Sequence, residues 1–210
     1  MHPVEPRISA YMSTLVRRHD DPVLIEMEDH AARNGFPIVG RLCGVTIELL
    51  ARSVGARRVF ELGSGYGYSA WWFARAVGEQ GEIHCTDGDP HNASAAEGYL
   101  TRAGVWDRVT YHVGDALTHL KQTEGEFDVV YCDVDKVGYP ECWRHARDRV
   151  RVGGLWICDN TLWSGRVLEE DRDEATQAIV EHNAMVAEDP DYLSVIVPTR
   201  DGLMVALRVS

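Results

Sequence analysis

The chain has 210 residues, enough for one well-buried core and few for two independent domains, so we expect a single domain over residues 1–210. With 33 acidic against 21 basic side chains, its formal net charge of -12 would repel nucleic-acid backbones and anionic membrane surfaces, which excludes both as expected partners. The five cysteines are scattered without a CxxC pair, and no apolar run is long enough for a signal sequence or a membrane span. We therefore expect a cytoplasmic protein.

The N-terminal part of the chain is predicted to be helical. Asp21 followed by Pro22 is typical of a helix N-cap and the first residue of the helix. We expect this helix to run through Arg33 and to end at Gly35, and we expect a second helix over Val39–Val54. A short amphipathic segment precedes them.

After these N-terminal helices (residues 1–54), residues 55–210 are expected to form the core. Short β-branched runs there alternate with longer amphipathic segments. The predicted strands are Arg57–Leu62, Glu82–Thr86, Arg108–Val113, Phe127–Cys132 and Gly154–Cys158, and the predicted helices between them are Tyr68–Val77, Pro90–Ala103, Ala116–Lys121 and Tyr139–Val150. This alternation predicts an α/β fold in which helices cover both faces of a parallel sheet.

The C-terminal part breaks the alternation. A predicted helix over Asp171–Ala187 is followed by two predicted strands, Tyr192–Pro198 and Leu203–Val209. Their connection, Thr199–Gly202, contains an Asp-Gly dipeptide, which is typical of a hairpin. We therefore expect the last two strands to be antiparallel neighbours, and we expect only Thr161–Glu170 to be irregular.

A glycine-rich turn, ELGSGYGYS, follows the first predicted strand and starts at Glu61. Glycines let backbone amides come close to a ligand, which makes Gly63 and Gly65 candidate cofactor-binding residues. A dinucleotide-binding turn has the spacing G-x-G-x-x-G, whereas here the third glycine, Gly67, comes one position early. An anionic Glu61 beside the turn suits a cofactor with a cationic amino group better than a pyrophosphate. The turn therefore favours S-adenosylmethionine over NAD.

Aspartates end the next two predicted strands. Asp87 is placed to accept hydrogen bonds from ribose hydroxyls, a role typical of an acidic residue about 20 positions after such a turn. Asp115 is placed to accept a hydrogen bond from an adenine amino group. The alternative is an ordinary strand-to-helix turn with both aspartates as helix N-caps. Three strand ends with matching chemistry favour ligand binding.

Oxygen-bearing side chains also follow the fourth and fifth predicted strands, namely Asp133 and the pair Asp159 and Asn160. Ligands of open α/β sheets bind beyond the carboxyl ends of the strands, so these side chains are expected to converge. Oxygen ligands without histidine or thiolate indicate Mg²⁺, with Ca²⁺ or Mn²⁺ as alternatives. Cys132 and Cys158 are expected to point to the other side and to be buried. The alternative role for the three polar residues is helix N-capping.

Three protein oxygens would leave about three of the six octahedral positions of Mg²⁺ for water or for two adjacent hydroxyls of a phenolic acceptor. Lys136 is the candidate general base, because a nearby divalent cation disfavours its ammonium form. The alternative is a solvated lysine at the start of a helix.

Aromatic residues near this site are candidates for stacking on the acceptor. Trp163 is the preferred candidate, because it lies in the irregular segment directly after the predicted ligand pair. The weaker candidates, which could stack on the acceptor or bind its carboxylate, are Tyr66, Tyr68, Tyr139 and Arg166. Trp71 and Trp72 are expected to pack against the sheet.

Taken together, these motifs resemble the cation-dependent class I O-methyltransferases, a family that includes catechol and caffeoyl-CoA O-methyltransferases. The similarity covers most of the chain and rests on ELGSGYGYSA, CTDGDP, GDAL, DVVYCDVDKVGYP, GGLWICDNTLWSGRV and PTRDGLMVAL. It implies a Rossmann-like three-layer α/β/α sandwich whose seven-stranded sheet has the order 3-2-1-4-5-7-6, with the last strand antiparallel. It also suggests a homodimer.

The resemblance also implies roles for individual residues. Asp133, Asp159 and Asn160 would be the metal ligands, and Lys136 would be the base. The S-adenosylmethionine site would be lined by Glu61, Gly63, Ser64, Ser69, Asp87, Asp115 and Ala116, with Asp133 touching both cofactor and metal. The segment Gly35–Val39 departs from the family pattern, which leaves cofactor contacts there open.

The expected function is therefore methyl transfer from S-adenosylmethionine to one hydroxyl of a catechol-like small molecule. The N-terminal region is shorter than in the plant acyl-CoA enzymes, which favours a small free phenol. Two alternatives stay open. An NAD-dependent oxidoreductase would not need Asp159 and Asn160, and a regulatory nucleotide-binding module without turnover would not need Lys136.

Overall fold

A computed structural model describes residues 4–16 and 20–210. The amphipathic start forms helix α1 (Pro6–Leu15). The helix predicted to begin after Asp21 is α2 (Pro22–Asn34). Asp21 caps α2 as expected, because its side chain accepts a hydrogen bond from the Val23 amide at 2.8 Å. Gly35 ends the helix in the left-handed conformation, at φ 63°.

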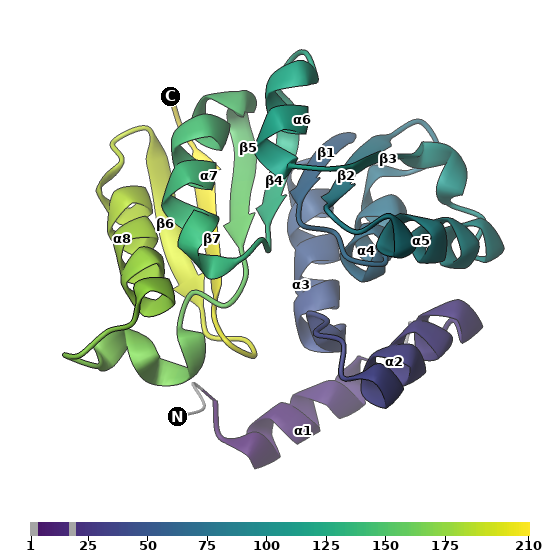
Figure 1. The fold of residues 1–210 in the computed structure, drawn as a ribbon, viewed down its shortest axis with the longest axis horizontal. Helices are drawn as coiled ribbons and strands as arrows, with labels where there is room; N and C mark the ends of the chain where they lie inside the picture. Colours follow the sequence, from purple (N-terminus) through teal and green to yellow (C-terminus); the bar gives the residue numbers. More distant parts are fainter. Residues whose placement is uncertain (1–3, 17–19) are drawn as a thin grey trace.

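Seven strands form one sheet (Figure 1). The strands are β1 (Arg58–Leu62), β2 (Glu82–Asp87), β3 (Val109–Val113), β4 (Phe127–Cys132), β5 (Val150–Cys158), β6 (Tyr192–Val197) and β7 (Leu203–Arg208). Their order is β3-β2-β1-β4-β5-β7-β6. β7 is antiparallel to both of its neighbours, and the other pairs are parallel. The predicted order and the predicted hairpin are both confirmed.

Two layers of helices cover the sheet. The helices α3 (Gly40–Ser53), α4 (Tyr68–Val77) and α5 (Pro90–Arg102) contribute to one core cluster, together with α2. The helices α6 (Ala116–Gln122), α7 (Tyr139–Ala146) and α8 (Glu174–Glu188) contribute to the other. In Figure 1, α1 and α2 lie below the sheet, on the side toward which the β4 and β5 arrows point. The expected three-layer α/β/α architecture is thus present.

The boundary between α7 and β5 differs from the prediction. The predicted helix to Val150 ends at Ala146, a single 3-10 turn covers Arg147–Arg149, and the strand begins at Val150, before the predicted start. Gly153, at φ 78°, lies inside the strand next to a shift in its register with β4. This irregularity lets Val150 pair with Phe127 and become fully buried.

The packing predictions for tryptophan and cysteine are confirmed. Trp71 and Trp72 are buried, and a Cβ atom on Gly44 of α3 would lie only 2.2 Å from the Trp72 ring. This close approach joins α3 to α4. All five cysteines are free and buried, including Cys132 and Cys158. Among the helices in the described ranges, none is both long and apolar enough to cross a membrane.

Candidate active site

A cavity of about 880 Å³ opens at the carboxyl edge of the parallel strands. We call its two parts the glycine end, formed by Gly63–Gly67 with Asp87 and Asp115, and the acidic end, formed by the side chains that follow β4 and β5. The predicted site residues that line the cavity are Gly63, Ser64, Gly65, Ser69, Asp87, Asp115, Ala116, Asp133, Lys136, Asn160 and Trp163. Glu61 and Asp159 are fully buried and do not belong to the lining.

The glycine turn connects β1 to α4 and lies directly on the backbone that follows β4. Gly63 has φ 85°, and a Cβ atom there would be 2.6 Å from the carbonyl oxygen of Asp133. Only glycine fits this position without displacing backbone. Tyr111 on β3 donates a hydrogen bond from its hydroxyl to the carbonyl of Gly65. The turn is therefore held against the neighbouring strand ends before any ligand binds.

Thr86, at the end of β2, is a bracing residue that sequence reasoning missed. Its carbonyl accepts from the Ser64 amide at 2.7 Å, and its amide donates to Ser64 Oγ at 3.1 Å. Its hydroxyl donates to the carbonyl of Glu61 at 2.7 Å and lies 3.2 Å from the Gly63 amide. The only sequence signal was a polar residue at the buried end of a strand. These bonds fix the glycine turn to β2.

Glu61 lies behind the glycine turn rather than in the cavity lining. It is fully buried on β1, and its Oε2 accepts a hydrogen bond from Cys85 Sγ at 3.2 Å. Burial raises the pKa of Glu61 to about 7, although the nearby polar groups of Ser69, Cys85 and Ser64 oppose the shift. Glu61 therefore lies behind the turn, next to the side chains of Ser64 and Ser69.

The two aspartates of the glycine end have different structural roles. Asp87 is not a helix cap; one of its oxygens accepts from the Gly65 amide at 3.1 Å and the other from the Asp89 amide at 2.8 Å. Asp89 caps α5 instead. Asp115 does cap α6, because its Oδ1 accepts from the amide of Thr118 at 2.8 Å. Hydrogen bonds from Thr118 also lower the pKa of Asp115.

Asp133 and Asp159 bring two negative charges together at the acidic end. Burial raises the pKa of Asp159 to about 7, and the charge of Asp133 adds to the shift, against the effect of Arg200. Burial also raises the pKa of Asp133, while Lys136 opposes this. Asp159 Oδ1 is buried without a hydrogen-bond partner among the described residues. The two carboxylates and the Asn160 amide offer hard oxygen donors, although no three His, Cys, Asp or Glu side chains of the described ranges form a cation site.

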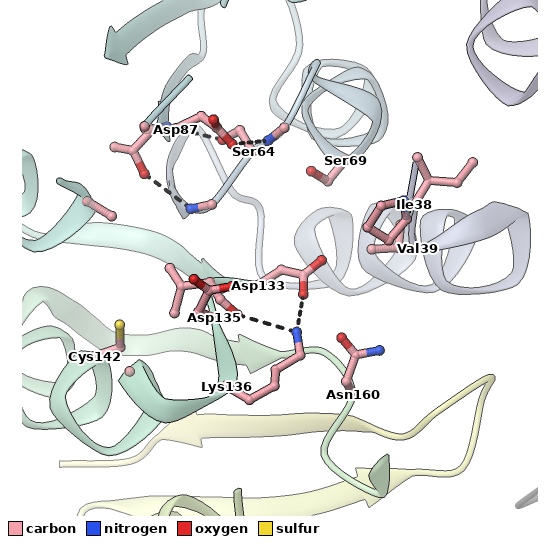
Figure 2. Close-up of a pocket in the computed structure, with 18 of the residues that line it drawn as sticks. Ile38, Val39, Ser64, Ser69, Asp87, Asp133, Asp135, Lys136, Cys142 and Asn160 are labelled. Carbon is pink, nitrogen blue, oxygen red and sulfur yellow. Dashed lines mark hydrogen bonds and ion pairs between the residues drawn. The ribbon is translucent and has the colours of Figure 1, made fainter. Parts of the chain in front are cut away.

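Lys136 reaches back to the acidic end from the 3-10 turn before α7 (Figure 2). Its Nζ lies 2.9 Å from Asp133 Oδ1 and 5.0 Å from the centre of the Tyr139 ring. Burial lowers the pKa of Lys136, but the charge of Asp133 and their hydrogen bond outweigh it, so the net shift is upward. Lys136 is thus a charged partner of Asp133 here, not a solvated helix-start lysine.

Two loops border the acidic end, namely the segment that follows β5 and the turn between β6 and β7. In the described ranges, the non-glycine residues with positive φ are Asn160, Trp163, Ser164 and Arg200, and all four lie in these segments. The turn between β6 and β7 docks on the segment after β5, because the Thr161 amide donates to the Gly202 carbonyl at 3.0 Å. Such left-handed residues concentrate where structure and function impose them. Sequence reasoning recognised this turn as a hairpin but did not include Arg200 in the site.

The segment left open by the sequence, Gly35–Val39, does reach the cavity. Phe36, Pro37, Ile38 and Val39 all belong to its lining. In Figure 2, Ile38 and Val39 lie on the opposite side of the cavity from Asp135 and Cys142. Among the weaker candidates, Tyr66 and Tyr68 line the cavity, whereas Tyr139 is fully buried outside the lining. Arg166 does not line it either; its guanidinium instead pairs with Asp173 at 2.6 Å.

The fold and this cavity define the chain as a class I methyltransferase, and comparisons with known proteins identify the family. Residues 14–209 match the family model of an O-methyltransferase. The chain is 32% identical to a catechol O-methyltransferase of Niastella koreensis, over 95% of this chain and 96% of the relative. It is 35% identical to a catechol O-methyltransferase of Mycobacterium tuberculosis, over 90% and 86%.

A solved structure agrees with this assignment. The O-methyltransferase TomG from Streptomyces achromogenes, determined in complex with S-adenosylmethionine, superposes with a TM-score of 0.87 at 29% identity, over 97% of this chain and 96% of TomG. The chain belongs to the O-methyltransferase family, and it is an S-adenosylmethionine-dependent enzyme. This replaces both alternatives, the NAD-dependent oxidoreductase and the regulatory module without turnover.

Proposed function

We propose that this enzyme transfers the methyl group of S-adenosylmethionine to one hydroxyl of a catechol-like small molecule with the help of a divalent cation, with Mg²⁺ as the first choice. The observation that carries the proposal is the pair of carboxylates at neighbouring strand ends beside one cavity, Asp133 in its lining and Asp159 fully buried. Asp159 Oδ1 has no partner in the described ranges, although a buried carboxylate oxygen normally has one. Relatives named catechol O-methyltransferase support the choice of acceptor.

The residues of the acidic end fit a hard cation. Asp133, Asp159 and Asn160 would hold it, because they supply oxygen donors and negative charge where the pKa values of both carboxyl groups are raised. When bound, the cation would hold two adjacent acceptor oxygens and make the reacting hydroxyl more acidic. The apolar side chains of Ile38, Val39 and Trp163 in the cavity lining would help a bound acceptor to exclude water from this reaction.

Lys136 is the proposed base, and its Nζ would receive the acceptor proton. In the free enzyme Asp133 keeps the lysine charged. If a cation takes up the charge of Asp133, the remaining influence of burial favours the neutral amine. Lys136 would then act as a base near neutral pH.

The glycine end is the proposed cofactor site. Asp87 would accept hydrogen bonds from the ribose, and Asp115 would accept one from the adenine amino group. Asp87 has its two oxygens aligned by backbone amides of Gly65 and Asp89, which supports this orientation. Ser64, Ser69 and Ala116 in the lining would complete the site.

The test is transfer of a labelled methyl group from S-adenosylmethionine to a panel of vicinal dihydroxy phenols, with Mg²⁺ or with a chelator. We expect transfer that disappears with chelator. Transfer that persists would contradict the role of the cation. If calorimetry detects cofactor binding but no phenol is methylated, the cofactor site is correct and the acceptor class is wrong.

A further inference from the structure

Arg200 is held at the acidic end by an unusual backbone conformation. It lies in the turn between β6 and β7 at φ 50°, where glycine or asparagine is the usual residue. The turn is anchored to the segment that carries Trp163, because the Leu162 amide donates to the Asp201 carbonyl at 2.9 Å. The arginine side chain belongs to the cavity lining together with Asn160 and Trp163. The fold therefore fixes the point from which this guanidinium enters the cavity.

The guanidinium of Arg200 keeps most of its donors available. Its hydrogen bond within the described part of the chain is a long one, 3.4 Å from Nη1 to Asp159 Oδ2, and 41% of its side chain is exposed. A guanidinium has five N–H donors in a planar fork. Arg166, by contrast, pairs with Asp173 at 2.6 Å and with Glu169 at 3.7 Å, and it does not line the cavity. Of these two arginines, Arg200 is therefore the one that can contact a ligand in the cavity.

The charges of the acidic end point to the sign of its ligand. Asp133 pairs with Lys136, and Asp159 pairs with Arg200, while Asp135 of the same lining is exposed to solvent. A cation bound by both carboxylates, as proposed above, would take Asp159 from Arg200, while Lys136 would be neutral as the base. An acceptor that carries a negative group would give the Arg200 guanidinium a new partner.

We infer that Arg200 binds a carboxylate of the acceptor, so that the preferred acceptors are vicinal dihydroxy aromatic acids rather than neutral catechols. This inference rests on the proposed function and names its substrate class. A guanidinium matches a carboxylate with two parallel hydrogen bonds, which is stronger and more directional than a contact with a neutral group. Trp163, anchored beside the Arg200 turn, offers its ring to the same acceptor.

The experiment compares 3,4-dihydroxybenzoate with 3,4-dihydroxybenzyl alcohol, which differ in charge but share the catechol. Both kcat/KM and calorimetric binding to the enzyme with S-adenosylhomocysteine and Mg²⁺ are measured. A hydrogen-bonded charge pair predicts that the wild type prefers the acid by about 10- to 100-fold. Arg200→Gln should lose this preference, because kcat/KM for the acid falls by much more than kcat/KM for the alcohol, whereas Arg166→Gln, the matched control outside the cavity, should keep it.

A second variant keeps the inference testable if Arg200→Gln fails to fold. Arg200→Gly removes the side chain and relieves the positive φ, so it should fold and behave as Arg200→Gln does. Equal use of both acceptors by the wild type, or a preference that survives in both variants, would overturn the inference. Tighter Mg²⁺ binding by the variants with an unchanged preference would also overturn it, because Arg200 would then serve the cation site alone.

The binding measurements separate this inference from the proposed function. If neither acceptor is methylated, the proposed acceptor class is wrong for catalysis. Binding of the acid that depends on Arg200 would still support a carboxylate site there, and binding that ignores Arg200 would refute it. Methylation of both acceptors at the same efficiency contradicts only the inference.

Discussion

The glycine end and the acidic end of the cavity obtain their unusual backbone conformations in different ways. At the glycine end, Gly63, Gly65 and Gly67 carry the positive φ angles, which glycine adopts at no steric cost. At the acidic end the same region of φ is occupied by residues with full side chains, including Trp163 and Arg200. Their strain is maintained by the docking of one loop on another.

The two ends also differ in how completely their polar groups are paired. The glycine turn is bonded to Thr86, Asp87 and Tyr111. At the acidic end, Asp159 Oδ1, Thr161 Oγ1 and Trp163 Nε1 are buried without hydrogen-bond partners among the described residues. Each such group costs about 1–3 kcal/mol. Behind the glycine turn, Glu61 Oε1 is also without a partner in the described ranges, but the backbone of the turn itself is bonded. The comparison indicates that the backbone of the cofactor end is preorganised, whereas the acidic end depends on its ligands to complete it.

Loss of Asp159 should have the largest effect. A catalytic cation contributes several kcal/mol, so in Asp159→Ala we expect turnover to fall about a thousandfold and its response to Mg²⁺ to disappear. Affinity for S-adenosylmethionine should change little, since the glycine end is intact. The measurements are methyl transfer against Mg²⁺ concentration and calorimetry with the cofactor. The exposed Asp107→Ala is the control. Turnover in Asp159→Ala that still rises with Mg²⁺ would refute the ligand role.

Loss of Lys136 should impair the chemical step at the same end. A general base contributes about 100-fold or more, so Lys136→Met should lower kcat by that factor and leave cofactor affinity unchanged. The rise of kcat with pH that reports the base should also vanish. Single-turnover rates across pH measure both effects, with Lys121→Met on the exposed surface of α6 as the control. An unchanged rate would remove Lys136 from the mechanism.

A methyl group on Gly63 should damage the glycine end. The added Cβ would lie 2.6 Å from the Asp133 carbonyl, at a φ that alanine rarely adopts. Together these effects predict that Gly63→Ala loses about 2 to 4 kcal/mol of unfolding free energy and binds S-adenosylmethionine more weakly. Gly98→Ala, inside helix α5 with only the end of Arg102 nearby at 3.7 Å, should instead be slightly stabilising. Denaturant unfolding that ranks the two variants the other way would contradict this account.

The smallest expected effect concerns Glu61 behind the glycine turn. Its pKa rises from 4.5 to about 7 on folding, so its contribution to stability is complete below about pH 4.5 and is lost as pH rises toward 7. Between pH 6 and pH 8 the wild type should lose about 1 kcal/mol relative to Glu61→Gln. Unfolding curves at both pH values measure this, with the exposed Glu79→Gln as the control. Equal pH dependence in wild type and Glu61→Gln would show that Glu61 does not titrate in this range.

Local patterns were sufficient for most elements and for the glycine end. Sequence signals that act over a few residues predicted elements such as α4 and β4 with their observed bounds. These signals are alternating and helical hydrophobic patterns, the Asp21-Pro22 cap and the Asp-Gly hairpin dipeptide. The sheet order came from the family resemblance rather than from these patterns. The β5 start was mispredicted because its bulge is stabilised by pairing with β4, a partner distant in sequence.

Only the tertiary structure decided how the site is completed. The sequence by itself determined which polar residues end each strand, because strand ends are local features, and therefore identified Asp133 and Asn160 as residues of one site. It could not place Glu61 behind the turn, bring Phe36–Val39 to the cavity, or pair Arg200 with Asp159 across 41 residues. These outcomes depend on which loops dock on one another, and docking follows from the shape of the packed core rather than from neighbouring residues.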